Sequence, residues 1–157
     1  MYSDSRLRSA EHARGLLLVQ TLVLFGGAIF AWSKLLPQFG DLPRALATAC
    51  FYGSTAFLAA LYWSCCVYQR PALASERRLR NFLLFCVVFA ASVVAYEAIV
   101  YYKLFGIGTT VFICTPGISP LQTPCFYGLI FFIAAFALSV GVTRRLKSSS
   151  ETIAPGL

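Results

Sequence analysis

Residues 48–70 read TACFYGSTAFLAALYWSCCVYQR, and residues 123–145 read TPCFYGLIFFIAAFALSVGVTRR. The two stretches align without a gap at an offset of 75 residues, from position 48 to position 123. Both contain a threonine, a cysteine and Phe-Tyr-Gly, and identical residues continue to the final arginine: Phe57/Phe132, Ala59/Ala134, Ala60/Ala135, Ser64/Ser139, Val67/Val142 and Arg70/Arg145. Such a repeat predicts a chain built twice from one membrane unit.

Long apolar runs decide the class of protein. The chain is 59% hydrophobic and only 12% charged, whereas soluble domains carry about 25% charged residues. Four runs approach or exceed the roughly 20 residues that cross a bilayer core: 16–36, 45–69, 81–105 and 125–143. We therefore expect an all-α integral membrane protein, a bundle of four transmembrane helices that leaves no room for a soluble catalytic domain.

The basic residues predict the orientation of this bundle. Ten of the 13 Lys and Arg residues lie before the first run, between the second and third, or after the fourth; the others are Lys34, Arg44 and Lys103. The positive-inside rule then places both termini and the middle loop in the cytoplasm, an N-in/C-in topology. We expect a bacterial inner (plasma) membrane protein whose basic residues contact anionic lipid headgroups and not nucleic acid.

This topology divides the chain into two parallel hairpin repeats, at about 15–70 and 80–145, in a single membrane domain of residues 1–147. A weaker echo relates the first helices of the hairpins, where Gly27 matches Glu97 at an offset of 70 residues (27 to 97). Residues 148–157 contain a serine run followed by Pro155-Gly156, and we expect them to form a disordered tail.

The repeated residues of the second and fourth helices fall on one helical stripe about 100° wide. Small residues on such a stripe let helix backbones approach closely inside a membrane. We expect these two helices to face each other, or equivalent neighbours, at the centre of the bundle. The packing positions predicted in this way are Gly53, Ala60, Ser64, Gly128, Ala135 and Ser139.

The six cysteines divide by predicted side. Cys65, Cys66 and Cys86 lie toward the cytoplasm, where buried thiols behave as small apolar side chains, and Cys50, Cys114 and Cys125 lie outside. A disulfide between Cys114 and Cys125 would close a loop of about 12 residues and stabilise the fold by roughly 3 kcal/mol. Cys50 then remains at the start of a helix, where the dipole favours its thiolate. Exchange among the three outer cysteines is chemically feasible.

A small helix bundle with cysteines at its outer face resembles the quinone-linked disulfide-forming membrane enzymes, including the vitamin K epoxide reductase family. The resemblance covers topology and cysteine placement. It implies a thiol–disulfide oxidoreductase that uses Cys50, Cys114 and Cys125, with a quinone as cofactor. The C-x-x-C motif of those enzymes is absent, because Cys50 is followed by Phe51-Tyr52-Gly53, so the sequence does not assign this activity.

Glu97 is the only carboxylate inside an expected span. It lies eight residues before Phe105, about 12 Å inward and close to mid-bilayer. A buried acid in a membrane is by default a candidate functional residue. Three roles are open for Glu97: a protonated group that hydrogen-bonds between helices, a site that carries protons or binds cations, and a surface that pairs with a basic residue of a partner subunit.

The function we expect from the sequence is non-enzymatic. His12 is the only histidine, and no Ser-His-acid set, P-loop or dinucleotide fingerprint is present, so we predict no metal site and no cofactor. The leading hypothesis is a small accessory or scaffold subunit that packs against lipid and other membrane subunits or itself. The alternatives are the oxidoreductase above and a small oligomeric transporter or channel that uses Glu97.

Overall fold

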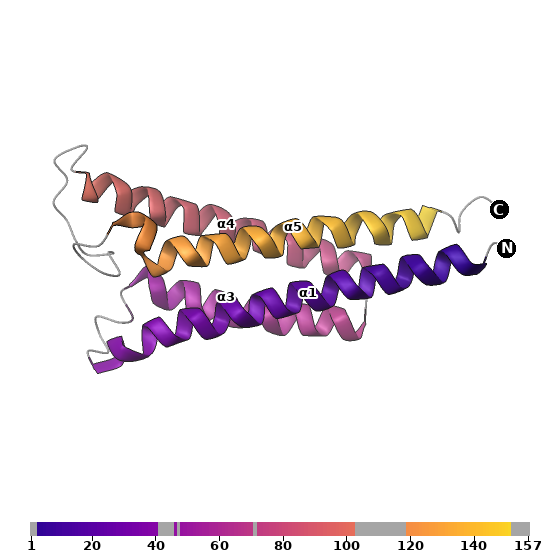
Figure 1. Ribbon diagram of the computed structural model, residues 1–157, viewed down its shortest axis with the longest axis horizontal. Coiled ribbons are helices and arrows are strands. Elements are labelled where there is room, and N and C mark those ends of the chain that lie inside the picture. The colour runs from indigo at the N-terminus through magenta and orange to yellow at the C-terminus, as the bar shows by residue number, and fades with distance from the viewer. Residues whose placement is uncertain (1–2, 41–45, 47, 71, 103–118, 152–157) are drawn as a thin grey trace.

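The computed structural model describes residues 3–40, 46, 48–70, 72–102 and 119–151. Four long helices run up and down in one bundle (Figure 1): α1 (Ser3–Leu35), α3 (Ala49–Gln69), α4 (Leu73–Tyr101) and α5 (Pro124–Glu151). Two short 3-10 helices, η1 (Leu36–Gly40) and η2 (Pro120–Gln122), lie beside them. Within the described ranges, four helices are long and apolar enough to span a membrane. The all-helical class with four helices of membrane-spanning length is therefore confirmed, while the hairpin repeats and the orientation stay predictions.

Local chemistry explains where α3 and α5 begin and end. Pro124 occupies the first position of α5, where its missing N–H is not needed. The Thr123 hydroxyl accepts a hydrogen bond from the backbone N–H of Phe126 at 3.4 Å and so caps this helix. At the other end of α3, Arg70 has left the helical region (φ −135°, ψ 80°), because a proline follows it in the sequence and disfavours the α conformation before it.

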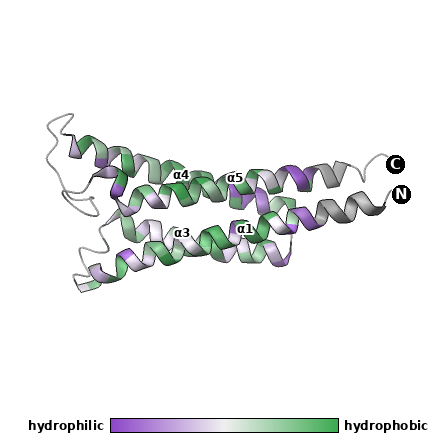
Figure 2. Cartoon of the chain, in the orientation of Figure 1, coloured by the Kyte–Doolittle hydropathy of each residue, from purple (hydrophilic) through white to green (hydrophobic). Residues whose placement is uncertain are grey.

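The bundle has two chemically distinct ends. α1 and α4 begin, and α3 and α5 end, at what we call the basic end, where polar residues gather (Figure 2). Its described basic residues are Arg14, Arg70, Arg77, Arg78, Arg80, Arg144, Arg145 and Lys147. At the opposite end, which we call the cysteine end, α3 and α5 start with Cys50 and Cys125 near their first turns.

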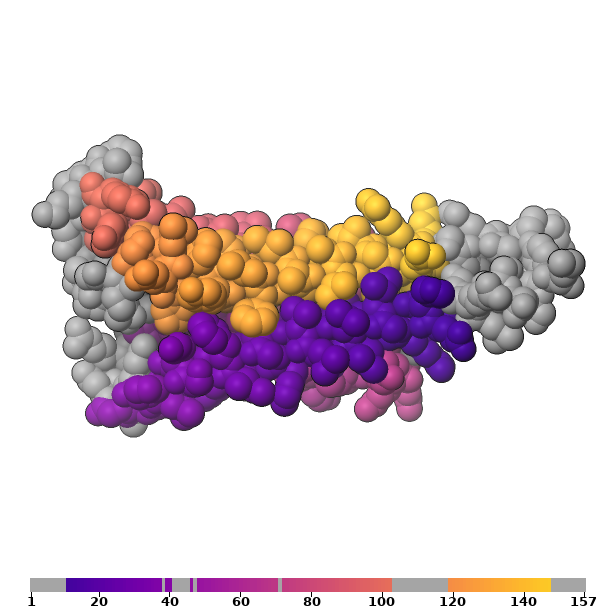
Figure 3. Space-filling model, viewed as in Figure 1, coloured from indigo at the N-terminus to yellow at the C-terminus, as the bar shows by residue number. Residues whose placement is uncertain are grey.

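The helices form a four-membered ring in which each packs against two neighbours. α1 packs between α3 and α5, with α1 and α5 side by side along one face (Figure 3), and α5 packs against α4. The α3–α4 contact is the least extensive of the four. α3 and α5 lie diagonally, and they meet at the centre through Phe57 and Phe132, whose parallel rings stack with centroids 4.0 Å apart.

The repeated stripe lies largely in the interior of this ring. Ala60, Ser64, Ala135 and Ser139 are all fully buried. Gly53 and Gly128 are only half-buried, and a Cβ added at Gly53 would meet no atom within 4 Å. The tightest contact at a described glycine is at Gly27 of α1, where an added Cβ would lie 2.5 Å from the Phe57 ring.

Three helix boundaries differ by many residues from those expected. α1 begins at Ser3 instead of residue 16. α4 covers Leu73–Tyr101 instead of 81–105, so a second acid, Glu76, lies in its first turn and is fully buried. The expectation that Glu97 is the only acid inside a span is therefore wrong. Several arginines after Glu76 are typical of a loop between two membrane spans, although a carboxylate is favoured in the first turn of a helix. α5 continues to Glu151, inside the segment expected to be a tail, of which 152–157 lie outside the described residues.

Replacing Gly27 by alanine tests the central packing. The new methyl group must displace the Phe57 ring, because its Cβ would lie 2.5 Å from the ring, and such overpacking destabilises by about 1–3 kcal/mol. Thermal unfolding in mild detergent should show a lower Tm. Gly15→Ala is the matched control, since a Cβ there meets nothing within 4 Å and helix propensity favours alanine. Equal Tm values for the two variants would contradict this packing.

Candidate functional site

Cys50 and Cys125 lie together at the cysteine end. Their Sγ atoms are 3.9 Å apart, although the residues are 75 positions apart in sequence. Each lies in the first turn of its helix, and the buried Ser54 hydroxyl donates to the Cys50 carbonyl at 2.7 Å. This distance exceeds the S–S bond length of about 2 Å. The two sulfur atoms are therefore in contact and not bonded to each other, although Cys50 itself belongs to a disulfide.

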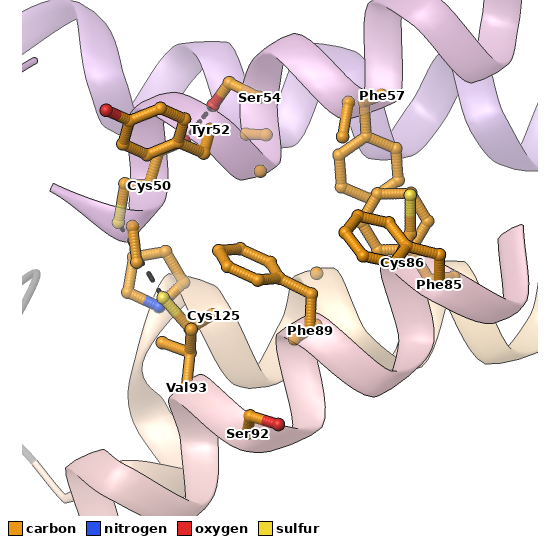
Figure 4. A pocket seen from close by; sticks show the side chains of 18 of the residues that line it. Cys50, Tyr52, Ser54, Phe57, Phe85, Cys86, Phe89, Ser92, Val93 and Cys125 are labelled. Carbon is orange, nitrogen blue, oxygen red and sulfur yellow. Dashed lines mark hydrogen bonds between the residues drawn. The ribbon is translucent and has the colours of Figure 1, made fainter. Parts of the chain in front are cut away.

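A large apolar cavity begins at these two sulfur atoms (Figure 4). Its volume is about 770 Å³, and it lies mainly between α3 and α4, the pair with the least extensive contact. The lining includes Cys50 and Cys125 at one end and Phe57, Phe85 and Cys86 at the other, with Phe89 between them (Figure 4). A cavity of this size is within the range that holds organic ligands.

The cavity opens on the outer surface of the bundle. Tyr52 and Phe85 both line it, and they are 56% and 66% exposed. This surface belongs to helices of membrane-spanning length, where the surrounding medium is lipid. A ligand therefore has access to the cavity from the hydrocarbon layer.

Glu97 completes the site from α4. Its carboxyl group is 3% exposed and is close enough to Cys125 to interact with it. It lies about one turn before the end of α4 at Tyr101, nearer that end than the sequence suggested. Glu97 does not line the cavity. The site therefore presents two sulfur atoms to an apolar cavity, with a carboxyl group behind one of them.

The structure brings together some of the predicted site residues and separates others. Cys50, Cys125 and Glu97 converge, as described. Cys114 lies outside the described residues. Cys50 belongs to a disulfide and Cys125 does not, so the structure does not show the predicted Cys114–Cys125 disulfide. Cys65 and Cys66 are 15 and 16 residues along α3 from Cys50, about 22 Å away along the helix. Cys86 is buried at the far end of the cavity.

The α4 wall of the cavity was not predicted from the sequence. Aromatic residues line the cavity from one face of this helix, at spacings of three, four and seven residues: Phe82, Phe85, Phe89 and Tyr96. This spacing is the signal that was available. In a sequence with 15% aromatic residues, it is hard to distinguish from ordinary lipid-facing positions.

Oxidation should link Cys50 to Cys125. In a Cys114→Ser variant treated with a mild oxidant, we expect one intramolecular disulfide between them, because their sulfur atoms are 3.9 Å apart and need only a small shift to reach bonding distance. Peptide mass spectrometry after blocking with maleimide identifies the pair. Cys86, which lies apart from this pair, should still react with maleimide after the oxidised protein is unfolded. Recovery of both Cys50 and Cys125 as maleimide adducts would contradict the geometry.

Comparisons of the chain with protein-family models, with curated proteins and with solved structures found no match. The interpretation of this site therefore depends on its own geometry. That geometry is a pair of sulfur atoms in contact, a lipid-accessible apolar cavity that starts at the pair, and a buried carboxyl group beside it.

Proposed function

We propose that the protein is a membrane thiol–disulfide oxidoreductase that passes electrons from Cys50 and Cys125 to a membrane quinone. The observation that carries this proposal is the contact between the two sulfur atoms at the head of the cavity. Two sulfur atoms at this distance can form and break a disulfide with little movement. An acceptor bound in the cavity would lie directly beside them.

The cavity matches the chemistry of a quinone. Quinones are dissolved in the bilayer and combine a flat ring with an apolar tail. Phenylalanine rings provide stacking surfaces for the ring, and the opening beside the exposed Phe85 gives the tail a route into lipid. Polar groups are confined mainly to the cysteine end, where Cys50, Tyr52 and Tyr96 line the cavity. The redox-active ring would therefore bind beside the cysteines.

The reaction balances with these components alone. The disulfide that holds Cys50 in the structure is first reduced by a dithiol. The Cys50 and Cys125 thiols then lose two electrons and two protons as the S–S bond between them forms. The quinone accepts both electrons and both protons and becomes a quinol. The oxidised pair then exchanges with an external dithiol, which regenerates the two thiols. Cys114, expected from the sequence near this end, is the candidate to relay that exchange.

Glu97 is placed to move one of the protons. Its carboxyl group lies beside the Cys125 thiol, so the carboxylate can accept the proton that this thiol releases as the disulfide forms. Total charge is unchanged by this transfer, so it avoids creating an additional charge in an apolar site. This role gives the buried acid a function within the site and needs no ion pathway through the bundle.

The accessory-subunit and transporter hypotheses remain predictions. The transporter hypothesis needs Glu97 to face a path for ions, and its carboxyl group lies beside Cys125 and not in the cavity wall. The accessory hypothesis depends on a partner, and purification in mild detergent tests it directly. A protein that is always alone and monomeric would eliminate the accessory role.

The redox proposal predicts a protein-dependent reduction of quinone. Purified protein should catalyse the oxidation of dithiothreitol by a short-chain quinone. The reaction is measured as the loss of quinone absorbance. Cys50→Ser and Cys125→Ser should each reduce the rate to background, because either change removes half of the disulfide. Cys66→Ser is the matched control, since Cys66 is exposed and distant from the pair. Unchanged rates in both site variants would eliminate the proposal.

Filling the cavity should weaken quinone binding without unfolding the protein. Gly53 lines the cavity, and a Cβ added there meets no atom within 4 Å. The side chain of a Gly53→Leu variant can therefore extend into open space beside the cysteines. We expect the KM for quinone to rise about tenfold, equivalent to about 1.4 kcal/mol, with little change in Tm. Gly15→Leu adds the same side chain in open space far from the cavity. The two variants should share a Tm and differ in KM; identical KM values would refute the cavity as the quinone site.

A further inference from the structure

Four polar side chains from four different helices are fully buried in the half of the bundle toward the basic end. They are Gln20 on α1, Ser64 on α3, Glu76 on α4 and Ser139 on α5, and each is 0% exposed. We call this set the polar layer. It shares no residue with the cysteine site or its cavity. Buried polar groups in a membrane-spanning bundle are costly unless they are paired.

Contacts between neighbouring helices place these residues at one level. On α3, Ser64 hydrogen-bonds to Thr21, the neighbour of Gln20, at 2.8 Å. On α4 and α5, the Ser139 hydroxyl donates to a carboxylate oxygen of Glu76. Ser64 and Ser139 each follow the stacked Phe57 and Phe132 by seven residues, two helical turns.

The α1–α5 contacts connect the two halves of the layer. Leu16 lies against Gly141, and Phe131 lies against Gly26. These contacts place Gln20 level with the α5 residues just before Ser139. The small residues Ala60 and Ala135, both fully buried, lie one turn from the serines and keep α3 and α5 close. All four polar side chains are therefore buried at about the same level of the bundle.

The polar layer contains more hydrogen-bond acceptors than donors. The Thr21 hydroxyl donates its only hydrogen to the Leu17 carbonyl, so Ser64 must be the donor to Thr21. Ser139 likewise uses its only hydrogen on Glu76. Both serine oxygens therefore keep lone pairs for a further partner.

The acid and the amide add two further acceptors. Oε2 of Glu76 and both amide atoms of Gln20 have no hydrogen-bond partner among the described residues. Four oxygen atoms can therefore accept, and only the Gln20 amide nitrogen can donate. This imbalance requires a positive occupant or a proton, because an uncompensated carboxylate in such surroundings is strongly unfavourable.

We propose that Gln20, Ser64, Glu76 and Ser139 form a binding site for a monovalent metal cation, with Na⁺ as the ion to test. Carboxylate, amide and hydroxyl oxygens are hard ligands that suit such ions. One carboxylate matches a single positive charge, whereas a divalent ion would leave an excess. Arg80, one turn further along α4, also attracts the carboxylate, but it is partly exposed and offsets only part of the cost.

Cation-dependent stability tests this site on the intact protein. Thermal unfolding is measured in NaCl, KCl and choline chloride at equal ionic strength and fixed pH. A bound ion stabilises the folded state by mass action, so we expect a saturable rise in Tm of about 5 °C in Na⁺ over choline. Glu76→Gln should abolish this rise. Glu97→Gln removes an equally buried carboxyl group outside the layer and should keep it.

Direct binding provides the second measurement. The ²³Na NMR signal should broaden with wild-type protein and become narrow again when excess K⁺ is added. It should also stay narrow with a Gln20→Leu variant. This variant retains the Glu76 carboxylate, so it can be used if Glu76→Gln does not fold. Equal Tm values in all three salts, with no broadening, would overturn the proposal. A Tm that responds to pH but not to Na⁺ or K⁺ would also overturn it, because a proton would then be the occupant.

Discussion

The stacked rings of Phe57 and Phe132 determine where everything else in the bundle lies. With centroids 4.0 Å apart, they join the two diagonal helices at one point on the bundle axis. Seven residues before these rings come Cys50 and Cys125, and seven residues after them come Ser64 and Ser139. Because seven residues make two helical turns, the same stripe presents sulfur at one level and hydroxyl groups at another. One aromatic contact thus positions both sites.

Such a contact needs room, and α1 provides it. Lipid offers no hydrophobic drive for helix association, so close packing has to supply the stabilisation. Gly27 faces the Phe57 ring with no side chain of its own, and the ring fills that space. α4 contacts α3 less extensively, through Trp63 with Phe82 and Ser75. The gap that remains between these helices is the cavity that begins at the cysteines.

Most of the fold could be predicted from hydrophobic length and the repeat. Four apolar runs of membrane-spanning length gave the four helices to within a few residues at most boundaries, and the burial of Ala60 and Ala135 agrees with the repeated stripe. The start of α4 could not be predicted in the same way. Its first turns contain Glu76 among arginines, and charge in a sequence is the usual sign of a loop. Only tertiary packing against Ser139 makes that acid part of the interior.

The site was harder to predict, because it depends on the register between helices that are distant in sequence. The sequence aligns Gly27 with Glu97, which suggests equivalent depths. In the structure, Gly27 lies beside Phe57 and Glu97 lies beside Cys125, two turns nearer the cysteine end. α4 is therefore displaced along the bundle relative to the position that the alignment implies for it. This displacement brings a carboxyl group to Cys125, and it brings Glu76 to Ser139, whereas Ser64 pairs with Thr21. Two similar stretches of sequence thus acquire different chemistry from the helices beside them.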